Sequence, residues 1–121
     1  MGGMTDQNTT TRSSLPHHKL LAYQAAVELL LAVKAANIRD AKLRDEAMRS
    51  AKSTCLNAAE GAGRVTRADK ARAFAIARGE AVEAVAAVEI AALSGDANEQ
   101  AAARCVVIAD RVVALLTGLI R

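Results

Sequence analysis

Residues Ser53–Phe74 read STCLNAAEGAGRVTRADKARAF, and this stretch decides the fold. Its first part is typical of a helix, because alanine has the highest helix propensity of all residues. Gly61 and Gly63 predict the end of that helix, since each glycine costs about 1 kcal/mol relative to alanine inside one. Thr66 and Asp69 have the spacing of a capping box, which starts a second helix. The stretch therefore predicts a helix, a tight basic turn and another helix.

On both sides of this stretch, apolar residues recur at helical spacing. Gly95 predicts a helix end, and Asp96 with Glu99 predicts a further capping box. The pattern predicts four helices, at about residues 16–36, 39–62, 67–93 and 96–120. Residues 1–14 are polar, so we expect a disordered tail before one domain over residues 15–121. Short connections favour an all-α fold, an antiparallel up-down-up-down four-helix bundle.

The composition predicts an unusual core. The chain is 52% hydrophobic but only 2% aromatic, so alanine, leucine, valine and isoleucine must fill the interior. The apolar faces of the second and third helices are wider than the stripe of about 100° that one core needs. The excess suggests contacts with more than one neighbour, including another subunit. Without a signal peptide or a long uncharged apolar run, we expect a cytoplasmic protein with no membrane contact.

Positive charge is concentrated in the middle of the chain. Residues 39–72 contain nine Lys or Arg and five Asp or Glu, whereas the remainder contains seven and eight. Two interpretations remain open: an ordinary solvated surface, or a surface that binds nucleic acid or an acidic partner. The candidate binding residues lie on the second helix and in the turn after it: Arg44, Arg49, Lys52, Arg64, Arg67, Lys70 and Arg72.

The sequence offers little for catalysis or metal binding. His17 and His18 are the only histidines, and neighbours on a helix point about 100° apart, so they cannot chelate one metal as an i, i+4 pair could. The Glu-x-x-His pairs of di-metal bundles and the third glycine of a dinucleotide-binding loop are both missing. We expect no enzyme activity, metal or cofactor. Cys55 and Cys105 are interpreted as buried thiols, with a disulfide left open if their helices are adjacent.

Polar residues at the glycine turn form a second candidate. Asn57 and Glu60 lie three residues apart and share one side of the second helix. Glu60 is placed to pair with Arg64 or to accept amide protons across the turn. One interpretation is a local network that fixes the turn, made of Asn57, Glu60, Gly61, Gly63 and Arg64. The other is a recognition site at the end of the bundle.

These residues carry a resemblance to a known family. The segment Ser53-Thr-Cys-Leu-Asn57-Ala-Ala-Glu60-Gly61-Ala-Gly63-Arg64, followed by Asp69, Phe74 and Ile76-Ala77-Arg78-Gly79-Glu80, resembles the hallmark of small bacterial four-helix bundle proteins. That family was first noticed as reading frames in 23S ribosomal RNA intervening sequences. The preceding Leu43–Ala51 segment is similar as well. Where the family has a serine after its third-helix glycine, this chain has Glu80.

The resemblance implies properties beyond the fold. The family includes the accessory variability determinant of diversity-generating retroelements, a pentameric barrel that binds a reverse transcriptase and nucleic acid through basic surface. The resemblance therefore implies a ring-like homopentamer and binding to RNA, DNA or a reverse transcriptase. The alternative is a structural or scaffold oligomer that has a protein partner and does not bind nucleic acid.

Overall fold

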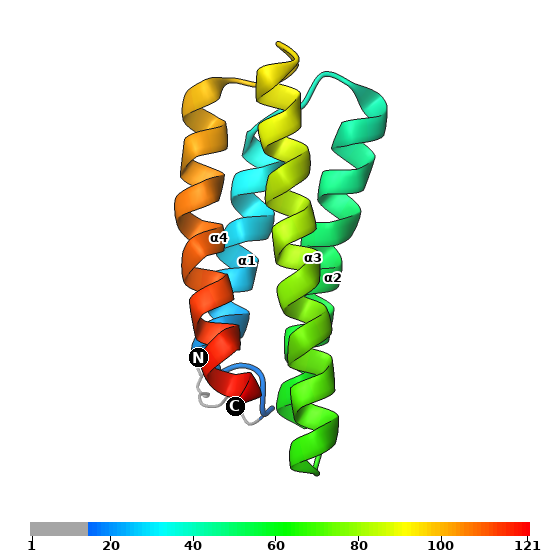
Figure 1. Cartoon of the computed structure of the whole chain (residues 1–121), viewed down its shortest axis with the longest axis vertical. Coiled ribbons are helices and arrows are strands. Elements are labelled where there is room, and N and C mark those ends of the chain that lie inside the picture. Colours follow the sequence, from blue (N-terminus) through cyan, green and yellow to red (C-terminus); the bar gives the residue numbers. More distant parts are fainter. Residues whose placement is uncertain (1–14) are drawn as a thin grey trace, which may run out of the picture.

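The computed structural model describes residues 15–121, and they form an antiparallel four-helix bundle (Figure 1). The helices are α1 (Leu21–Ala35), α2 (Ala41–Gly63), α3 (Arg67–Leu93) and α4 (Glu99–Ile120). Each helix packs against the next, and α1 also packs against α4, which closes the bundle. The predicted all-α, four-helix fold is confirmed. The tail predicted for residues 1–14 lies outside the described residues.

The first helix begins later than the sequence pattern predicted. Position 16 was the expected start, but α1 begins at Leu21 after an extended Leu20. The residues before it form a turn, in which the His18 amide donates to the Leu15 carbonyl and the Leu20 amide to the His17 carbonyl. The His17 ring packs edge-on against Tyr23, with the ring centres 4.7 Å apart. This local packing replaces the first helical turn that Pro16 suggested.

The link between α3 and α4 confirms one predicted cap and corrects the other. Gly95 has a φ of 80°, and its amide donates to the Ala92 carbonyl while the Asp96 amide donates to the Ala91 carbonyl. This left-handed glycine ends α3 as expected. The cap of α4 is Asn98, whose side chain accepts from the amides of residues 100 and 101. The predicted capping box of Asp96 and Glu99 is wrong, because Asp96 is used to close α3.

Alanine dominates the interior of the bundle. Most of the core residues are alanines with almost no exposed surface, and the largest fully buried apolar side chains are Leu29, Leu116, Val88 and Val112. Phe74 is also buried. Because alanine side chains are short, the helix backbones can lie close together over most of their length. At the end of the bundle opposite the glycine turn, the Arg39 amide donates to the Asp96 carbonyl. This hydrogen bond joins the connection between α1 and α2 to the connection between α3 and α4.

Gly61 lies inside the last turn of α2 and does not break it. The helix continues to Gly63, and Arg64 after it is extended. A Cβ atom at Gly61 would lie 2.5 Å from Cε1 of Phe74, whereas one at Gly63 would have no neighbour within 4 Å. The helix end predicted at residue 62 is therefore nearly right. The glycine at position 61, however, is not there to end the helix. Gly61 leaves space for the ring of Phe74.

Cys55 and Cys105 are free, buried thiols, so the disulfide left open in the sequence analysis is not formed. Burial raises the pKa of the Cys55 thiol to about 11 and raises the pKa of Cys105 as well. With a pKa near 11, only about one Cys55 in a thousand is a thiolate at pH 8. We expect Ellman's reagent to label the native protein slowly at pH 8 and the urea-unfolded protein at once. Stoichiometric labelling of the native fold within seconds would contradict this burial.

Candidate functional site

The tip of the bundle, residues 64–72, consists of the turn after α2 and the first residues of α3. Figure 1 shows that this hairpin extends beyond the adjacent ends of α1 and α4. The side chain of Thr66 accepts from the Asp69 amide at 3.1 Å, which confirms the predicted cap of α3. Val65 has 92% of its surface exposed. The tip is thus a projecting turn between two helices, and the second helix is capped by Thr66.

Two cations of the tip are held by intramolecular partners. The Nζ of Lys70 donates to the carbonyls of Gly61 at 3.3 Å and Ala62 at 3.0 Å. A cation is favourable there because the last carbonyls of a helix carry partial negative charge. Arg64 pairs with Glu60 at 2.8 Å, and this hydrogen bond raises the pKa of Arg64. The pairing of Glu60 with Arg64 was predicted and is confirmed.

The other two cations of the tip are Arg67 and Arg72. Both side chains are exposed, and neither forms an ion pair with another described residue. Residues 64–72 contain four Lys or Arg and one acidic residue, Asp69. This net charge of +3 equals that of the whole chain, so the charges of the remaining residues sum to zero and the net positive charge lies at the tip. A small basic projection of this kind is suited to contact with phosphate groups.

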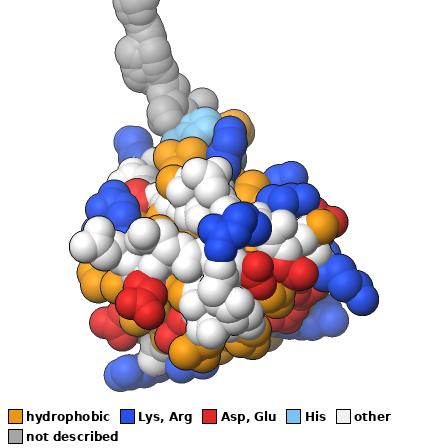
Figure 2. Space-filling model, turned by 90° about the horizontal axis from the view of Figure 1, so that it is seen from above, with side chains coloured by type: hydrophobic (Ala, Val, Ile, Leu, Met, Phe, Trp, Pro, Cys, Tyr) orange, Lys and Arg blue, Asp and Glu red, His pale blue; other side chains and the backbone are white. Residues whose placement is uncertain are grey.

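The other end of the bundle has no such excess. Figure 2 views the molecule from above, and around this end basic, acidic and apolar side chains are interspersed. Arg44 lies near this end and donates to the Ile38 carbonyl at 3.2 Å. It is twenty residues along α2 from Arg64, a separation of about 30 Å. Arg44 and the tip therefore do not form one continuous patch.

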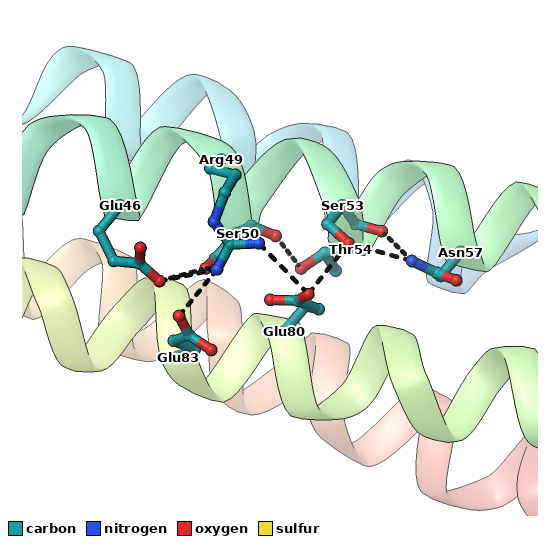
Figure 3. Close-up of polar contacts among 8 residues, drawn as sticks. All are labelled: Glu46, Arg49, Ser50, Ser53, Thr54, Asn57, Glu80 and Glu83. Atoms are coloured by element: carbon teal, nitrogen blue, oxygen red, sulfur yellow. Dashed lines mark hydrogen bonds and ion pairs between the residues drawn. The ribbon is translucent and has the colours of Figure 1, made fainter.

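Arg49 is the centre of a polar seam between α2 and α3, shown in Figure 3. It contacts Glu46 at 2.7 Å, Glu83 at 2.9 Å and Glu80 at 3.6 Å. The hydrogen bond from Arg49 lowers the pKa of Glu46, and its partner Glu46 raises the pKa of Arg49. The sequence analysis placed Arg49 among the residues that bind a partner. In the structure Arg49 lies within ion-pair distance of three carboxylates, two of them on α3, so it joins the two helices.

Asn57 belongs to this seam and not to the turn. Its side-chain amide donates to the Ser53 carbonyl at 2.9 Å and to the Ser53 hydroxyl at 3.1 Å. Ser53 in turn donates to Glu80 at 3.2 Å (Figure 3). The predicted network therefore divides in two: Glu60 and Arg64 pair at the turn, whereas Asn57 links to α3. The other carboxylate oxygen of Glu80 is buried and has no hydrogen-bond partner in residues 15–121.

The seam was missed as a unit in the sequence analysis, although a signal was present. Glu46, Ser50, Ser53 and Asn57 recur at spacings of three and four residues, so they share one side of α2. Their partners Glu80 and Glu83 lie more than twenty residues later, and only the hairpin brings them together. Lys52 of α2 is exposed and lies about 100° around the helix from Ser53, away from this row. Lys52 thus remains a surface cation on the outer side of the bundle.

The described residues contain no group of His, Cys, Asp and Glu that could hold a metal ion. Within the same range, none of the helices is both long and apolar enough to cross a membrane. The chemistry that remains at the surface of the described residues is a basic tip, a polar seam in which one arginine meets three carboxylates, and several exposed apolar side chains. These features are suited to binding.

Comparison with known proteins adds a family. The family model described as 23S rRNA-intervening sequence protein matches residues 18–118, a span that includes α1, α2 and α3 and all but the end of α4. No curated protein matches the chain.

Proposed function

Since this chain belongs to the family of 23S rRNA-intervening sequence proteins, we propose that it is a non-enzymatic, self-associating bundle that binds nucleic acid through its tip. Arg67 and Arg72 make the contacts with phosphates. Arg64 and Lys70 add positive charge while they stabilise the turn. The observation that carries the proposal is the position of these four cations on a projecting hairpin, two of them without an ion-pair partner among residues 15–121.

Self-association multiplies the effect of a small basic site. One tip offers only a few phosphate contacts, which gives weak binding at physiological salt. In a ring-like homopentamer, five tips would engage one nucleic acid, and the second and later contacts would be intramolecular. A nucleic-acid-processing partner such as a reverse transcriptase would then be brought to the same RNA or DNA. Arg44 and Arg49 take no part, because they hold the fold.

Fluorescence anisotropy with a labelled RNA hairpin tests this proposal. We expect binding at low salt, with an affinity that falls linearly against salt concentration on a log–log plot, because bound cations displace counterions from the phosphates. The absorbance of the purified protein at 260 nm gives a second readout, since one Tyr and no Trp leave bound RNA to dominate the spectrum. Absence of binding to both RNA and DNA at low salt would contradict nucleic-acid binding.

A scaffold with a protein partner is the second candidate, and one observation favours it. Val65, in the turn of the tip, has 92% of its surface exposed next to Arg64, and protein interfaces combine an apolar centre with an enrichment of arginine. Capture of a protein that stays bound after nuclease treatment, together with no change in affinity for RNA when the tip is altered, would support this alternative.

A further inference from the structure

The third helix has two apolar faces, with charged residues between them. Its inner face is buried alanine, with Phe74 and Val88, yet its opposite face is also uncharged. We call this opposite face the α3 stripe, which consists of Ala75, Gly79, Val82, Ala86, Ile90 and Leu93. Ala86 is half-buried and the others are exposed, Leu93 by 87%. One core requires only one apolar stripe on a helix, so the second apolar face of α3 is left without a partner within residues 15–121.

The α3 stripe fits another helix and not a nucleic acid. It spans about 27 Å at 1.5 Å per residue, and three of its six residues are small and three are branched. The stripe contains no Lys or Arg, and carboxylates of Glu83 and Glu89 lie along its sides, so phosphates would be repelled. Small residues let a second helix approach closely, while Val82, Ile90 and Leu93 supply apolar area.

The same chain carries a matching surface on α4. This surface, the α4 face, consists of Ala103, Val107, Ala114 and Gly118, all exposed. Val107 has 71% of its surface exposed among these small neighbours. Arg111 lies beside this face and is about half exposed, with only a 3.7 Å contact to Glu28. Glu83, beside the α3 stripe, is also about half exposed, although it contacts Arg49.

The opposite charges lie at matching heights. Arg78 of α3 donates to Thr117 of α4 at 2.8 Å, which sets the relative positions of these antiparallel helices. Glu83 is five residues beyond Arg78, and Arg111 is six residues before Thr117, so both lie at nearly the same height in the bundle. When a second copy has the same orientation, its Arg111 is therefore level with Glu83 of the first.

We propose that the α3 stripe of one copy packs against the α4 face of a second copy. This contact rests on the self-association in the proposed function and specifies which surfaces make it. Because the two surfaces differ, the contact is heterologous, and each copy keeps one free surface of each kind for the next neighbour. The α3 and α4 corners of the bundle point in different directions, so repetition of the contact turns the assembly toward a closed ring.

A pair of charged substitutions tests the contact by light scattering coupled to size exclusion. We expect Val82→Asp and Val107→Asp each to reduce the oligomer to smaller species while circular dichroism stays helical, because both side chains are on the surface. A mixture of the two variants should form a one-to-one heterodimer and nothing larger, since one intact surface of each kind remains. Leu56→Asp, on the outer side of α2 and 71% exposed, is the matched control and should keep the full assembly.

The charges give an independent second test. Glu83→Arg and Arg111→Glu should each weaken self-association, and the double variant should recover at least part of it. Oligomers of unchanged mass in both aspartate variants, or a mixture that does not form heterodimers, would overturn this contact and leave self-association intact. An unaltered protein with the mass of one chain would instead overturn self-association itself, while RNA binding by the tip is measured separately.

Discussion

The double variant Arg67→Glu/Arg72→Glu is expected to bind an RNA hairpin at least about 30-fold more weakly than the unaltered protein near 0.1 M salt. Each phosphate contact contributes a slope of about 0.7 to 0.9 in log affinity against log salt, which is about sixfold per contact at this salt concentration. Two lost contacts give the 30-fold loss, and the introduced carboxylates add repulsion. Fluorescence anisotropy over a salt series should also give a slope reduced by about two.

The matched control is Lys34→Glu/Lys42→Glu. These exposed lysines lie at the other end of the bundle, and their reversal changes the net charge by the same amount. We expect an affinity within about threefold of the unaltered protein, because charges more than a Debye length of about 10 Å from the bound RNA are largely screened. Equal losses in both double variants would show that total charge, and not the tip, governs binding. No loss in either would remove Arg67 and Arg72 from the site.

Features that depend on neighbouring residues were predictable from the sequence. The Thr66 cap of α3 and the left-handed Gly95 after it were both predicted, because each is decided by residues within one turn. The four helices followed from apolar spacing for the same reason. The pairing of Glu60 with Arg64 spans four residues of one helix and its following turn, so helical geometry alone indicated it.

Features that depend on tertiary contacts were not predictable in this way. Arg49 looks like any exposed cation in the sequence, and its three carboxylate partners include two from α3. Asp96 satisfies the pattern of a cap, but its amide is needed to close α3. Residues 16–20 suit a helix, and packing between His17 and Tyr23 replaces it with a turn. In each case a long-range or competing contact outweighed the local preference.

Replacement of Gly61 by alanine is expected to destabilise the fold by about 1 to 3 kcal/mol, although alanine is the better helix former. The new Cβ would lie 2.5 Å from Cε1 of Phe74, and relief of such overpacking shifts a buried ring or the backbone. Gly63→Ala is the matched control, because it has no neighbour within 4 Å. We expect Gly63→Ala to be neutral or to stabilise the fold by up to about 1 kcal/mol. Urea unfolding followed by circular dichroism measures both.

Removal of the ring should invert the effect of Gly61→Ala. Phe74→Ala alone is expected to cost about 3 to 5 kcal/mol, since it deletes the only phenylalanine from a core of small residues. In that background, Gly61→Ala no longer meets the ring and keeps only its gain in helix propensity, so it should stabilise the protein by up to about 1 kcal/mol. The two substitutions would then be coupled by about 2 kcal/mol or more in a double-mutant cycle. Simple additivity would mean that Gly61 serves the backbone of α2, and that the approach of Phe74 is not what requires a glycine there.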